Sequence, residues 1–110
     1  MVVNLVARVL MMITVRRVQR VRDWGGLYQI WIDGERVAWI FSGMTKTLEV
    51  DPGEHEMVCM MNKTLTSPKL KFVVGETPVT FEVEAGAGRF SAAGERMRVS
   101  HNYIQLRQVT

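Results

Sequence analysis

Cysteine and long apolar runs are scarce in this chain of 110 residues. The single cysteine, Cys59, excludes an internal disulfide, so the fold has to be stabilised by its core. No apolar run is longer than five residues, whereas a membrane-spanning helix needs about 20, so no membrane span is predicted. With 47% hydrophobic and 23% charged residues at this length, we expect one globular domain over residues 1–110.

Signatures of metal binding and catalysis are also missing. The thiol and the two imidazoles of His55 and His101 are too few and too isolated for a zinc site, so we predict no metal and no cofactor. No serine or cysteine has the sequence context of a hydrolase nucleophile. We therefore predict a protein that is not an enzyme, and a small hydrolase built around either histidine is the less favoured alternative.

Positive charge is concentrated near the N-terminus. The net charge is +3, but residues 1–22 hold five arginines and no acid, which leaves a charge of −2 for the other residues. Such a basic arm can attract phosphates or an acidic surface, or it can be the solvated face of an edge strand. The order of basic and apolar residues differs from that of a secretory signal, so we expect a cytoplasmic location. The arginines are Arg8, Arg16, Arg17, Arg20 and Arg22.

Residues 1–12 fit two structures. Their apolar residues fit one stripe of a helix and equally one face of a strand, and the many β-branched residues favour the strand. A start at Met12 would make the preceding residues an added leader. As a strand, this apolar segment could add to the sheet edge of a second copy, which suggests a homodimer.

From Ile13 onward, apolar and polar residues alternate, and turn signals such as Asp33-Gly34 separate the runs. This pattern predicts an all-β fold: an antiparallel sandwich of seven or eight strands, with a short helical turn near residues 91–98. Glu82 and Glu84 alternate with apolar residues, and we expect both to be exposed to solvent. The expected strands are residues 13–21, 27–32, 37–41, 45–50, 55–61, 70–74, 79–83 and 103–109.

Aromatic residues provide the candidate binding site. If the isoleucines of two adjacent strands face the core, then Trp31, Trp39 and Phe41 face outward on one hairpin. The opposite orientation, in which Trp39 and Phe41 belong to the core, also fits the sequence. An outward aromatic surface flanked by Arg16, Arg17, Arg20 and Arg22 would bind a protein partner or a second copy. Nucleic acid or glycan binding through the same aromatic and basic face is the alternative.

Several turns and strands have a pattern that is similar to a known family. A strand ends in Ile32-Asp33-Gly34, and Pro52-Gly53-Glu54-His55 leads into a later strand. Over residues 13–83 this resembles small bacterial β-sandwich modules of the PEGA-like kind, and other small bacterial domains that have a Ser-Pro turn. The resemblance implies a non-catalytic module for display, scaffolding or binding, and it supplies no catalytic residues.

Overall fold

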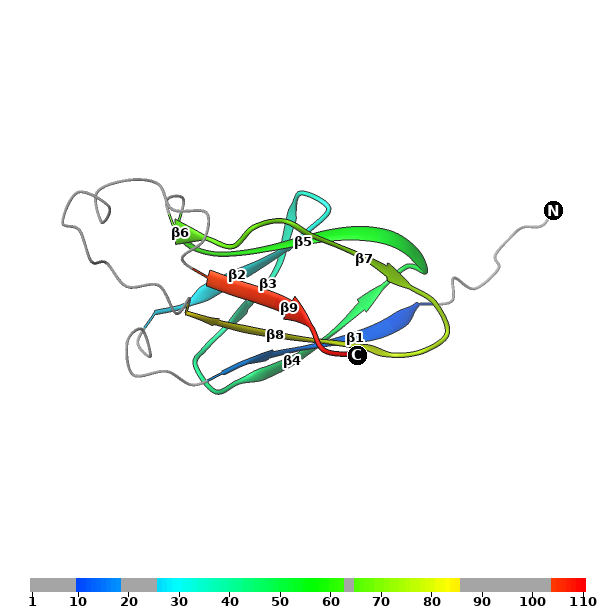
Figure 1. Cartoon of the computed structure of the whole chain (residues 1–110), viewed down its shortest axis with the longest axis horizontal. Helices are drawn as coiled ribbons and strands as arrows, with labels where there is room; N and C mark the ends of the chain where they lie inside the picture. The colour runs from blue at the N-terminus through cyan, green and yellow to red at the C-terminus, as the bar shows by residue number, and fades with distance from the viewer. Residues whose placement is uncertain (1–9, 19–25, 63–64, 86–103) are drawn as a thin grey trace.

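The chain folds into a β-sandwich. The computed structural model describes residues 10–18, 26–62, 65–85 and 104–110, which form nine strands in two packed sheets (Figure 1). The strands are β1 (Met11–Arg17), β2 (Tyr28–Ile32), β3 (Glu35–Ile40), β4 (Thr45–Val50), β5 (Gly53–Asn62), β6 (Leu65–Thr66), β7 (Leu70–Val74), β8 (Val79–Ala85) and β9 (Ile104–Gln108).

Each sheet combines strands from distant parts of the sequence. The four-stranded sheet, sheet A, has the order β4-β1-β8-β9, and the five-stranded sheet, sheet B, has the order β3-β2-β5-β6 with β7 also paired to β5. Neighbouring strands are antiparallel except β1 and β8, which run parallel with Ile13 opposite Val79. β3 and β4, which follow each other in sequence, therefore lie at the edges of different sheets.

The core lies between the sheets because one side of each strand is apolar. Ile13 and Val15 of sheet A and Tyr28 and Ile30 of sheet B are fully buried. Across the interface, the rings of Phe72 and Phe81 meet edge to face with their centroids 4.8 Å apart. Such aromatic pairs stabilise a core beyond the area that they bury.

The alternation of the sequence predicts these faces correctly. The apolar sets of β2, β7 and β8 point inward as expected, and the strand interpretation of the N-terminal segment is confirmed for Met11 and Met12. Residues 1–9 and the helical turn expected at 91–98 lie outside the described residues. No helix in the described part of the chain is long and apolar enough to cross a membrane.

Two expectations are wrong, and one short strand was not predicted. The two-residue strand β6 is too short to give an alternating pattern, so it was not predicted. The arginine-bearing strand is not an edge strand, because β1 lies between β4 and β8. Glu84 is buried rather than exposed, because Arg107 of the neighbouring strand β9 covers it and donates a 2.8 Å hydrogen bond to its carboxylate.

Candidate functional site

A β-bulge in the hairpin of β2 and β3 sets the outer face of sheet B. Ile30 pairs with Ala38, but the next pair is Trp31 with Arg36, so Val37 is an extra residue on β3. The extra residue shifts the alternation by one position. As a result Arg36 lies on the same outer face as Trp31 and Trp39.

Trp31 lies in the middle of this face. Its strand neighbours are Arg36 on β3 and Val58 on β5. The side chain is half-buried, and its indole N–H donates a 2.9 Å hydrogen bond to Oε1 of Gln29. Trp31 therefore faces outward, as expected if the isoleucines of this hairpin face the core. Its indole N–H already has a hydrogen-bond partner.

Trp39 and Phe41 are more exposed. Their relative accessibilities are 44% and 54%, which excludes the alternative that they belong to the core. The guanidinium of Arg36 lies over the Trp39 ring, 4.4 Å from its centroid. We call Trp31, Arg36, Trp39 and Phe41 the aromatic stripe. Large exposed aromatic side chains next to an arginine are typical of protein-binding surfaces.

The arginines predicted to flank this surface are not beside it. Arg16 lies on the outer face of sheet A, on the other side of the sandwich, where it forms an ion pair with Glu82. Arg20 and Arg22 lie outside the described residues. The cation of the stripe is Arg36, which the sequence pattern does not predict, because strict alternation along β3 would place Arg36 on the face opposite to Trp39.

Arg17 is buried, so its assignment to a contact surface is wrong. Only 1% of the residue is accessible, and its guanidinium lies 3.5 Å from the centroid of the Tyr28 ring. Nη1 also donates hydrogen bonds of 2.6 Å to the Gly26 carbonyl and 3.0 Å to the Ile40 carbonyl. The buried charge is thus solvated by backbone oxygens and an aromatic face, and it joins sheet A to sheet B.

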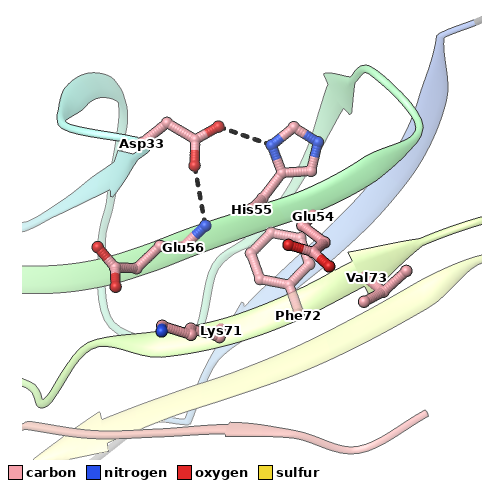
Figure 2. Close-up of a pocket in the computed structure, with 7 residues that line it drawn as sticks. All are labelled: Asp33, Glu54, His55, Glu56, Lys71, Phe72 and Val73. Atoms are coloured by element: carbon pink, nitrogen blue, oxygen red, sulfur yellow. Dashed lines mark hydrogen bonds and ion pairs between the residues drawn. The ribbon is translucent and has the colours of Figure 1, made fainter.

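A second polar cluster lies where the turns meet at one end of the sandwich (Figure 2). His55 Nδ1 is 2.6 Å from Oδ2 of Asp33, in the turn between β2 and β3. His55 Nε2 is 2.6 Å from the carbonyl oxygen of Asp51, in the turn between β4 and β5. The other carboxylate oxygen of Asp33 accepts a 2.9 Å hydrogen bond from the Glu56 amide. His55 therefore connects two turns.

The protonation state of this cluster follows from its partners. A carboxylate and a carbonyl both accept hydrogen bonds, so both ring nitrogens can donate only when the imidazole is protonated. Burial of the ring opposes that charge, but the hydrogen bonds to Asp33 and Asp51 outweigh it, and the pKa of His55 is raised above 6.5. The hydrogen bond from His55 lowers the pKa of Asp33 below 3.8.

The cleft beside His55 has a volume of about 470 Å³ and is lined by charged residues of β5 and β7 together with Phe72 and Val73. Both nitrogens of the ring are already occupied, so in this arrangement it offers no nitrogen to a substrate. Cys59 is fully buried, and burial raises the pKa of its thiol to about 12. His101 lies outside the described residues, and within them no three potential metal ligands cluster.

Comparisons with protein-family models, curated proteins and solved structures found no match for this chain.

Proposed function

We propose that this protein is a non-catalytic assembly module that associates with a second copy of itself through the aromatic stripe. The observation that carries the proposal is the exposure of Trp39 and Phe41 on the outer face of a sheet. Isolated exposed apolar residues are ordinary on protein surfaces, but here two exposed aromatic side chains lie on the same sheet face as a half-buried tryptophan.

The surroundings of the stripe support a protein as the ligand. The guanidinium of Arg36 already covers one face of the Trp39 ring, the kind of face on which a sugar or base would stack. The other described arginines lie on the far sheet or in the core, so they do not form a phosphate-binding surface with the stripe. Tryptophan and arginine are also the residues most enriched in the energetic centres of protein interfaces.

Sedimentation equilibrium across a concentration series tests this proposal. We expect the unmodified chain to form a dimer, and Trp39→Ala to raise the dissociation constant at least about tenfold, because truncating an interface tryptophan removes a large buried contact. Val109→Ala is the matched control, because Val109 is 43% accessible, against 44% for Trp39, and lies next to β9 at the far edge of sheet A.

The control variant should associate like the unmodified chain. Unfolding of Trp39→Ala by denaturant should remain close to that of the unmodified protein, which separates loss of contact from loss of fold. A chain that stays monomeric at every concentration, or a Trp39→Ala variant that associates normally, would contradict the proposal.

A further inference from the structure

The edges of the two sheets meet along one side of the sandwich. β3 ends sheet B and β4 ends sheet A, and both strands line a cleft of about 530 Å³. Its apolar lining includes Leu10 and Val37, which are 40% and 45% accessible, and the half-buried Leu48. Natural sheet edges are usually covered or charged, because an open edge can pair with another strand. Within the described residues no strand pairs with the outer edges of β3 and β4, and the protection of these edges is limited to their charged residues and the bulge on β3.

The charges along these two edge strands are balanced. β3 contributes Glu35 and Arg36, and β4 contributes Lys46 and Glu49, so each sign occurs twice. Arg36 and Lys46 therefore offset Glu35 and Glu49 when two copies approach through these strands. The cleft between the strands is also lined by the acidic Asp33 and Asp51 and by His55, which is hydrogen-bonded to both.

Arg36 and Glu49 have no ionic partner within the described residues. Arg107 and Arg16, in contrast, are held by the carboxylates of Glu82 and Glu84. Arg36 contacts the ring of Trp39, which leaves the N–H groups at the edge of its guanidinium for a carboxylate. Arg36 and Glu49 lie on the outer faces of their sheets, so an edge-to-edge contact would bring them to the same surface.

We propose that two copies of this chain join through a twofold axis that pairs β3 of each copy with β4 of the other, with Arg36 bound to the partner's Glu49. This inference rests on the proposed self-association and specifies its geometry. A twofold rotation about an axis along the strands exchanges the two layers, so sheet B of one copy continues into sheet A of the other. The β3 and β4 edges of each copy are then paired at once, in a closed dimer.

The bulge at Val37 defines the register of this pairing. Because Val37 is the extra residue, the outer positions of β3 and its continuation are Arg36, Trp39 and Phe41. The outer positions of β4, read in the opposite direction, are Glu49, Thr47 and Thr45, all exposed. The first pair is an ion pair, and the other two are aromatic–threonine pairs, which are favourable across strands. In this dimer, the aromatic side chains of the stripe contact the threonines on the partner's edge strand β4.

Charge reversal with rescue tests the inference. Arg36→Glu and Glu49→Arg each place like charges opposite one another twice in the dimer, so each should raise the dissociation constant at least about tenfold. The double variant restores opposite charges, and we expect its dissociation constant to return to within about threefold of the original. Both positions are exposed, so the free energy of unfolding, measured in parallel at low concentration, should change little.

Each outcome decides the matter. Loss of the dimer in the single variants with recovery in the double variant supports the paired edges. Single variants that associate normally, or a double variant that stays monomeric, would overturn this geometry. If Trp39→Ala weakens the dimer while the charge reversals do not, the self-association stands and only the β3–β4 pairing is wrong.

Discussion

Arg17 and His55 join parts of the chain that are far apart in sequence. Arg17 reaches from β1 across the core to the carbonyls of Gly26 and Ile40. Its backbone also accepts a hydrogen bond from the Gly43 amide and donates one to the Met44 carbonyl, which fixes the turn before β4. A buried arginine is stabilising only while its donors remain bonded, so the carbonyls of Gly26 and Ile40 contribute to its stability in the core.

Replacement of Arg17 tests this role. Arg17→Met keeps the apolar part of the side chain but leaves the buried Ile40 carbonyl and the half-buried Gly26 carbonyl without their charged donor, so we expect the free energy of unfolding to fall by about 3 kcal/mol. Arg16→Met, on the neighbouring and exposed position, should cost less than about 1 kcal/mol, because it removes only an ion pair at the surface. Denaturant titrations check both values. Equal losses in the two variants would contradict the role of Arg17 in joining the two sheets.

The His55 cluster makes stability depend on pH. The folded-state pKa of His55 is raised, so its contribution is complete below the ordinary value of 6.5 and is lost as the pH rises through the folded-state pKa. The pKa of Asp33 is lowered, so its contribution is complete above 3.8 and is lost as the pH falls through its folded-state pKa. The cluster therefore stabilises most between these two ordinary values.

His55→Gln tests this dependence, because glutamine is neutral throughout. We expect the loss in unfolding free energy relative to the unmodified chain to be larger at about pH 5 than at about pH 8. The comparison cancels the titration of His101, which both proteins share. Asp33→Asn should remove most of the same pH dependence. A loss in the His55→Gln protein that is equal at both pH values would contradict a protonated imidazole.

At the scale of elements, the β2–β3 hairpin combines a tight turn with a bulge. Asp33 and Gly34 have φ angles of 54° and 85°, both left-handed, as a two-residue hairpin turn requires. Asp33 tolerates this conformation with the help of its bonds to His55 and Glu56. The turn and the bulge together fix which residues of β3 join the aromatic stripe.

The left-handed turn predicts a specific cost for a methyl group. Gly34→Ala should lower the free energy of unfolding by about 1 to 2 kcal/mol, because a Cβ atom strains this conformation although nothing lies within 4 Å of it. Gly75→Ala is the matched control, because its added Cβ also meets nothing and its φ is not left-handed. We expect a change within about 0.5 kcal/mol for the control in the same denaturation experiment.

The elements also show where sequence reasoning succeeds and where it stops. Strands such as β2 and β7 were predicted because alternation and turn residues are local properties, readable within a few residues. The outward position of Arg36 could not be predicted in this way. A bulge is a mismatch in the pairing of two strands, and the sequence of one strand alone does not reveal it. Arg17 was misplaced for a related reason: its charge predicts exposure, and only the distant carbonyls and the Tyr28 ring make burial favourable.

At the scale of the whole molecule, the sequence predicts two sheets but not how the strands are shared between them. Period-two patterns define an inner face for each strand without saying which strand is its neighbour. The pairing of β1 with both β4 and β8 therefore comes only from the structure. The same holds for the candidate site. The sequence predicts an outward orientation of Trp39 and Phe41 as one alternative, but it does not predict that they lie on, or directly after, a strand at the edge of a sheet.

The parallel pairing of β1 with β8 also imposes an order on folding during synthesis. Every strand of sheet B precedes β8 in the chain, so that sheet can be complete while sheet A still lacks two of its four strands. β1 has to wait until Val79 and the residues after it have left the ribosome, because only then is its parallel neighbour available. Contacts this distant in sequence are slow to close, so the apolar face of sheet B stays partly uncovered until β8 and β9 have been synthesised.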